Sequence, residues 1–197
     1  MRRKLFYILV DNSGSIDMDI ALEEINKLIA YMREDPYLFE TVYLRIESNT
    51  QEICPLCDLY QIQGARFSIA IDKDRDVNMG IHSLIEKFES EFKKTTMKQK
   101  GDWMPTMLIY SNNVPNINDI SPRAMKYFAE RIFIFNTEGE EKSSPNDGFL
   151  RFRIDKNKYY FNRIGDIRIG TDVEKHIDGI SYPSGEDFYY SDKISNI

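Results

Sequence analysis

An apolar run from Leu5 to Val10 ends abruptly in the polar segment Asp11-Asn12-Ser13-Gly14-Ser15. Uninterrupted apolar strands are typical of parallel sheets that are buried on both faces. In open α/β sheets, ligands bind beyond the carboxyl ends of such strands. Asp11, Ser13 and Ser15 would place a carboxylate and two hydroxyls at that edge, and these oxygen donors suit Mg²⁺ or Mn²⁺. The segment therefore predicts a buried first strand with a binding site at its end.

The rest of the chain alternates between segments with helical and strand-like patterns. Apolar residues at helical spacing predict two long amphipathic helices, one around residues 22–32 and one around residues 81–92. Asp17 is expected to cap the first helix, and Asp35-Pro36 to end it. A further helix is expected to begin at Ser121-Pro122. Strands after the first are predicted over residues 41–46, 66–71, 106–110 and 132–135.

This alternation predicts an α/β fold, in which a mostly parallel central sheet has helices on both faces. The last third of the chain has a different pattern. A polar loop is expected over residues 138–147, followed by short strands at 149–154, 159–164 and 167–169. One or two helical turns are expected within residues 172–177, before a tail from residue 182 to residue 197.

Charge and composition exclude two classes of partner. The 197 residues carry a formal net charge of -6, which argues against a broad nucleic-acid-binding surface. No apolar run approaches the length of a membrane span. The basic start, Met1 to Lys4, precedes only six apolar residues and lacks the cleavage pattern of a signal peptide. We therefore expect a cytoplasmic protein that binds neither nucleic acid nor membrane.

The two cysteines, Cys54 and Cys57, have the spacing C-x-x-C. Two thiols cannot complete a zinc site without help, and only His82 and His176 are available as further soft ligands. A redox motif would be expected at the start of a helix, whereas a strand-like run precedes this pair. We therefore expect two incidental thiols in a reducing compartment.

A strand that ends in Asp-x-Ser-x-Ser, followed by an amphipathic helix, resembles the von Willebrand factor A (vWA) family. In that family the motif opens a metal-ion-dependent adhesion site. Four further segments are similar to the bacterial TerY-type branch, which is named for tellurium-resistance gene clusters. They are Asp35-Pro36-Tyr37, Glu40-Thr41-Val42-Tyr43-Leu44, Pro55-Leu56, and Lys100-Gly101-Asp102-Trp103 with Pro105. The similarity covers roughly residues 4–135 and then fades.

The resemblance implies a Rossmann-like vWA fold over residues 1–197, best matched over 1–137 and divergent over 138–197. It also implies a non-enzymatic domain that binds a protein partner through an Asp or Glu carboxylate of that partner. TerY-like proteins occur with a kinase-like and a phosphatase-like protein in stress-response gene neighbourhoods. The resemblance therefore implies an adaptor in such a system.

The resemblance also assigns the metal ligands. Asp11, Ser13 and Ser15 match the family motif in full, but the family's threonine falls on Val77 and its final aspartate on Asn112. A charge pair at about 4 Å contributes ~4 kcal/mol at an effective dielectric constant near 20, so losing one carboxylate weakens cation binding strongly. We therefore expect the binding of Mg²⁺ or Mn²⁺ to be weak or absent, unless Asp76 replaces the lost charge.

Asparagines complete the expected binding face. Asn12, Asn78 and Asn113 lie in the same loops as the motif and the altered ligand positions. The amides of Asn112 and Asn113 can donate as well as accept, so they could hold a partner carboxylate without metal. Two other functions stay open. One is a metal-assisted phosphoesterase that uses Asp11 and Asp76, and the other is a purely structural subunit in which the motif is a relic.

Overall fold

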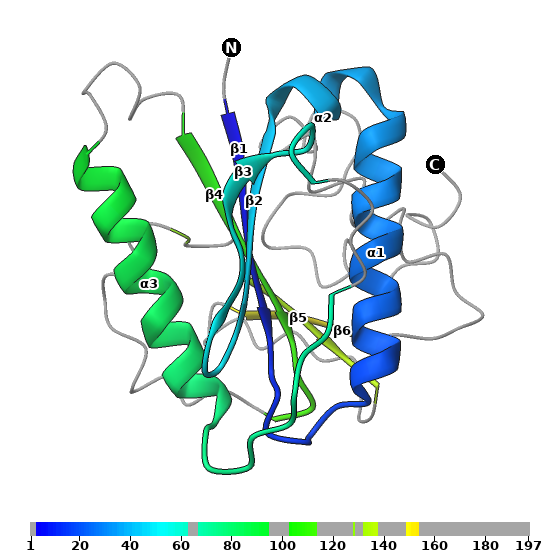
Figure 1. The fold of residues 1–197 in the computed structure, drawn as a ribbon, viewed down its shortest axis with the longest axis vertical. Coiled ribbons are helices and arrows are strands. Elements are labelled where there is room, and N and C mark those ends of the chain that lie inside the picture. Colours follow the sequence, from blue (N-terminus) through cyan, green and yellow to red (C-terminus); the bar gives the residue numbers. More distant parts are fainter. Residues whose placement is uncertain are drawn as a thin grey trace, which may run out of the picture.

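A six-stranded sheet organises the chain in the computed structural model, which describes residues 3–62, 67–94, 103–113, 128, 132–137 and 149–153 (Figure 1). In chain order, its helices and strands are β1 (Arg3–Val10), α1 (Met18–Glu34), α2 (Pro36–Thr41), β2 (Val42–Ser48), β3 (Glu52–Asp58), α3 (Val77–Lys94), β4 (Trp103–Tyr110), β5 (Ile132–Asn136) and β6 (Phe149–Arg153). The predicted α/β class is therefore confirmed.

The strands lie in the order β3-β2-β1-β4-β5-β6, so β1 occupies the interior of the sheet between β2 and β4. Neighbouring strands are parallel, except that β3 runs antiparallel to β2. In the register of the sheet, Val10 pairs with Ser48 on one side and with Tyr110 on the other. The carboxyl ends of three strands consequently meet at the segment that follows β1.

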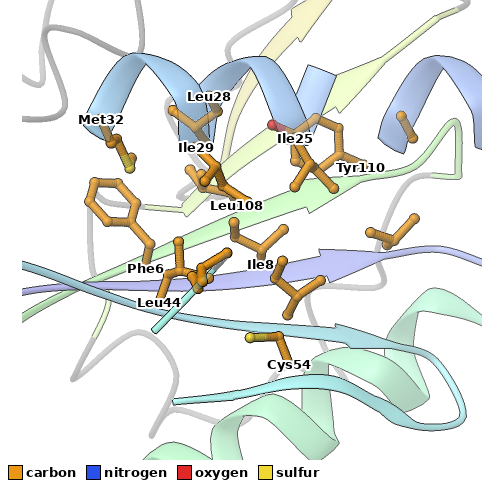
Figure 2. Close-up of a cluster of buried hydrophobic side chains, with 14 of the residues drawn as sticks. Phe6, Ile8, Ile25, Leu28, Ile29, Met32, Leu44, Cys54, Leu108 and Tyr110 are labelled. Carbon is orange, nitrogen blue, oxygen red and sulfur yellow. The ribbon is translucent and has the colours of Figure 1, made fainter. Parts of the chain in front are cut away.

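Helices cover both faces of the sheet, with α1 on one side and α3 on the other (Figure 1). Because strand side chains alternate between faces, Phe6 and Ile8 of β1 pack with α1, while Leu5, Tyr7 and Leu9 pack with α3. Figure 2 shows the first of these clusters. Burial on both faces explains why the β1 sequence is apolar without alternation. Within the described residues, no helix has the length and apolar character needed to cross a membrane.

The ends of α1 follow the sequence signals. The Asp17 carboxylate accepts a hydrogen bond from the backbone N–H of Ile20 at 3.1 Å, which confirms the predicted N-cap. Asp35 ends the helix as predicted. The Asp35 carboxylate accepts a hydrogen bond from the backbone N–H of Leu38 at 3.0 Å. It thereby caps the short helix α2, which the sequence pattern did not predict.

One predicted strand is wrong. Residues 67–71 form no strand, and the third strand is instead β3, over residues 52–58. Phe67 and Ile69 are apolar because they pack against the α1-side core from a loop, which gives them a strand-like alternation. Strand β3 was not predicted because it contains Pro55 and because its register with β2 is irregular. Strand β6 is confirmed, while the expectations for residues 121–122, 138–147 and 159–197 lie outside the described residues.

Candidate functional site

Backbone hydrogen bonds join the loops at the carboxyl edge of the sheet. The N–H of Asp11 donates to the carbonyl of Tyr110 at 2.9 Å, and the N–H of Ser111 donates to the carbonyl of Phe135 at 2.9 Å. The chain after β1 is thereby held against β4, and the chain after β4 against β5. Gly14 has a φ of 93°, a left-handed conformation that glycine adopts without strain, and it turns the chain toward α1.

The carboxylate of Asp11 is fully buried and lies at the centre of this edge. Oδ1 accepts from the Ser13 N–H at 3.0 Å and from Asn49 Nδ2 at 2.6 Å. Oδ2 accepts from Ser15 Oγ at 2.7 Å, Ser111 Oγ at 2.5 Å and Asn113 Nδ2 at 3.1 Å. The structure therefore brings Asp11, Ser13 and Ser15 together as the motif predicts. It adds donors from the loops after β2 and β4.

These donors decide the charge state of Asp11. Burial by itself would raise the pKa of the carboxyl group, but hydrogen bonds from Ser111, Ser15 and Ser13 outweigh it and lower the pKa below its usual value. Asp11 is therefore ionised at neutral pH. A carboxylate with a lowered pKa and five donors is a weak base and a weak nucleophile.

Asn112 lies beside this network and braces the ends of β4 and β5. Its Nδ2 donates to the carbonyl of Ser15 and to Thr137 Oγ1, both at 2.8 Å. Its Oδ1 accepts from the backbone N–H of Thr137 at 2.8 Å. The position that the resemblance assigns to a ligand carboxylate is thus occupied by an amide that connects neighbouring loops.

Asp76 and Val77 form the start of α3, one as a cap and the other as a core residue. Asp76 is exposed, and its Oδ1 accepts from the backbone N–H of Met79 at 3.0 Å, the geometry of a helix N-cap. Val77 is buried in the core beneath α3, and Asn78 is half-buried. In its described contacts Asp76 therefore caps α3 and does not replace the carboxylate that is missing at Asn112, and Val77 is a core residue.

Asn49 and Ser111 were not among the predicted site residues, and Asn12 was predicted to lie on the binding face. Asn12 is buried, and its Nδ2 donates to the carbonyl of Ala70 at 2.8 Å while its Oδ1 accepts from the Asn49 N–H at 3.1 Å. It therefore ties loops together inside the protein. A signal for the two missed residues was present, because Asn49 and Ser111 each follow a predicted strand closely.

A small surface covers the buried network. We define the loop face as the following residues: Ser13, Gly14, Ile71, Lys73 and Asn113. Ile71 Cγ2 and Lys73 Cε lie 3.6 and 4.0 Å from the position that a Cβ on Gly14 would take. Ile71 is 57% exposed, so an apolar side chain reaches solvent from the loop that runs past Gly14 toward the start of α3.

The atoms around Asp11 do not form the ligand set of a divalent cation. A Mg²⁺ ion needs oxygen ligands at 2.0–2.1 Å in octahedral geometry. Here Asn113 Nδ2 lies 3.1 Å from Asp11 Oδ2 and 3.3 Å from Ser13 Oγ, so an amide nitrogen stands between two of the expected ligand atoms. Ser15 Oγ donates to Asp11 and accepts from the Asn112 N–H at 3.3 Å. This arrangement does not fit a resident cation.

Comparisons with known proteins identify the fold. No family model matches the sequence, and no curated protein matches it. Among solved structures, the crystal structure of the SpRpn10 VWA domain is similar, with a TM-score of 0.51 and 11% sequence identity. The alignment covers 80% of this chain and 91% of that one. At this identity the likeness shows the fold alone, and it confirms the expected Rossmann-like architecture of vWA type.

Proposed function

We propose that this chain is a non-enzymatic interaction domain that binds a protein partner through its loop face. The exposure of Ile71 beside Gly14 carries the proposal, because it places an apolar contact next to polar Ser13 and Asn113 at the ligand-binding edge of the sheet. A single exposed apolar residue is ordinary on a protein surface, so the proposal depends on where Ile71 lies and not on its exposure alone. The fold likeness to a VWA domain is consistent with this function.

The partner is proposed to present an Asp or Glu carboxylate. Lys73 is exposed, and its aliphatic stem passes close to Gly14, so its ammonium group supplies positive charge near the loop face. A partner carboxylate paired with Lys73 needs no metal ion. Because such a pair is exposed, its contribution is small and falls with salt concentration. The apolar contact at Ile71 then supplies most of the affinity.

The biological setting is proposed from the sequence resemblance alone. TerY-like segments favour an adaptor in the cytoplasm of a bacterium, with kinase-like or phosphatase-like partners in a stress response. The alternative of a metal-assisted phosphoesterase needs two cooperating carboxylates. In the structure Asp76 caps α3, and the carboxylate of Asp11 is saturated with donors. We therefore favour an interaction domain over an enzyme.

A matched pair of variants tests this function. Ile71→Asp places a charge on the loop face, and Tyr60→Asp does the same at Tyr60, which is 76% exposed and follows β3 at the opposite edge of the sheet. Immobilised protein would be cross-linked in a lysate of the source cells, and captured proteins identified by mass spectrometry. We expect Ile71→Asp to lose partners that the wild type and Tyr60→Asp retain. Equal capture by all three proteins would contradict the proposal.

A further inference from the structure

The amide of Asn113 occupies a central position at the loop edge. Its Nδ2 lies 3.1 Å from Asp11 Oδ2 and 3.3 Å from Ser13 Oγ. An amide nitrogen carries two N–H donors and no acceptor capacity, so it can satisfy both oxygen atoms at once. These are two of the atoms that the sequence motif assigns to a cation.

Asn49 approaches the same carboxylate from the opposite oxygen. Its Nδ2 lies 2.6 Å from Asp11 Oδ1 and 3.3 Å from the carbonyl of Arg75. Its Oδ1 is buried, has no hydrogen-bond partner among the described residues, and lies 2.6 Å from where a Cβ on Gly80 would stand. Flipping the amide would turn this oxygen toward the Asp11 carboxylate and bring two acceptors together. The orientation with nitrogen toward Asp11 is therefore the favourable one.

We propose that Asn113, supported by Asn49, takes the place of a divalent cation at this edge of the sheet. The two amides join the Asp11 carboxylate to the loops after β2 and β4, as a bound ion would join its ligands. The site is therefore assembled without metal. This inference concerns the same edge as the proposed function, but it holds whether or not the loop face has a partner.

The hydrogen-bond count explains why a cation would be excluded. An ionised carboxylate offers about four lone-pair positions, and five donors already contact Asp11. A cation would have to displace the Asn113 amide and compete with the hydroxyl donors. The structure also distinguishes Asn113 from its neighbour Asn112. The resemblance places the family's aspartate at Asn112, whereas the residue that faces Asp11 is Asn113.

Single substitutions at these neighbours test the proposal. The full chain, freed of metal with a chelator, would be titrated with Mn²⁺ by calorimetry as wild type, Asn113→Asp and Asn112→Asp. Asn113→Asp replaces an exposed donor with a second carboxylate beside Asp11, so we expect Mn²⁺ to bind it at least tenfold more tightly than the wild type. Asn112→Asp is expected to bind no better than the wild type.

Melting temperatures provide a second measurement. We expect the Tm of the wild type to be the same in chelator and in millimolar Mn²⁺, and the Tm of Asn113→Asp to rise when Mn²⁺ is added. Micromolar Mn²⁺ binding by the wild type that Asp11→Ala abolishes would overturn the proposal. An Asn113→Asp variant that binds no tighter than wild type would overturn it too. Neither result depends on partner capture, so the two proposals can fail separately.

Discussion

At the scale of single residues, Asp11 is the side chain on which the loop edge depends. Asp11→Asn would remove the charge and turn an amide N–H toward donors such as Asn49 and Asn113. We expect a loss of about 2–4 kcal/mol in the free energy of unfolding at pH 7, because buried donors lose a charged acceptor. Urea denaturation would measure it. Asp19→Asn, an exposed residue in the first turn of α1, is the control and is expected to cost ~1 kcal/mol or less.

The lowered pKa of Asp11 also gives this contribution a pH dependence. A carboxyl group whose pKa is lower in the folded state stabilises the protein above its unfolded pKa, about 3.9, and loses that contribution as the pH falls toward the folded value. The wild type should therefore lose stability more steeply than Asp11→Asn below about pH 4. Parallel acid-denaturation curves for the two proteins would contradict the assignment.

Cys54 and Cys57 are in contact, although their spacing suggested only incidental thiols. Register shifts in β3 place their sulfur atoms 3.6 Å apart, and both are free thiols. Burial, with the nearby Cys54 thiol, raises the pKa of Cys57 to about 12, so little thiolate is present at neutral pH. We expect iodoacetamide to alkylate Cys57 far more slowly than free cysteine at pH 7.5, as followed by mass spectrometry. Urea should remove the difference, and equal rates in the folded protein would refute the prediction.

At the scale of elements, substitutions at the start of α3 distinguish two roles for Asp76, as a helix cap or as a charge that supports a bound cation. Asn caps helices as well as Asp, whereas Ala at a cap costs about 1 kcal/mol. If Asp76 acts as a cap, Asp76→Asn should unfold at nearly the wild-type urea concentration and Asp76→Ala at a lower one. If its charge stabilises the edge through a bound cation, the two variants should lose similar stability. Added Mn²⁺ would then stabilise the wild type but neither variant.

Elements were predictable where one local pattern determined them. The six apolar residues of β1, the Asp17 cap and the stripes of α1 and α3 all carried their own signals. The third strand was not predictable in this way. β3 contains Pro55 and is paired irregularly, whereas residues 67–71 alternate like a strand because they pack against the core from a loop. Strand pairing decides such cases, and it is not visible in a short window of sequence.

At the scale of the whole molecule, topology decides which residues meet. The sequence predicted Asp11, Ser13 and Ser15 as a group, because they lie within one turn of chain. Asn49 and Asn113 reach Asp11 only because β2 and β4 flank β1 in the sheet. Asn113 was expected at the binding face, but strand order is a property of the assembled sheet, so local motifs did not predict that the amides of Asn49 and Asn113 contact Asp11.

An ionic cluster around the buried side chains of Arg45 and Glu47 joins the sheet to α3. Arg45 of β2 contacts Glu47 at 2.9 Å and also pairs with Glu52 and Glu91, while the hydroxyl of Tyr7 donates to Glu91 at 2.6 Å. Burial opposes the charge on Arg45, but the three carboxylates outweigh it and raise the pKa of the guanidinium. One cation thus holds charges from β2, β3 and α3 together beneath the helix.

This cluster predicts that Arg45 matters more to the assembled fold than an ion pair on the surface. In Arg45→Met, Glu47 would remain 2% exposed without its counterion, so we expect a loss of about 3–5 kcal/mol in the free energy of unfolding. Glu23→Gln is the control, because Glu23 is exposed on α1 and pairs there with Lys27, and such pairs contribute about 1 kcal/mol or less. Urea denaturation at low and high salt would compare them. Equal losses would show that packing of α3, and not its buried charges, joins it to the sheet.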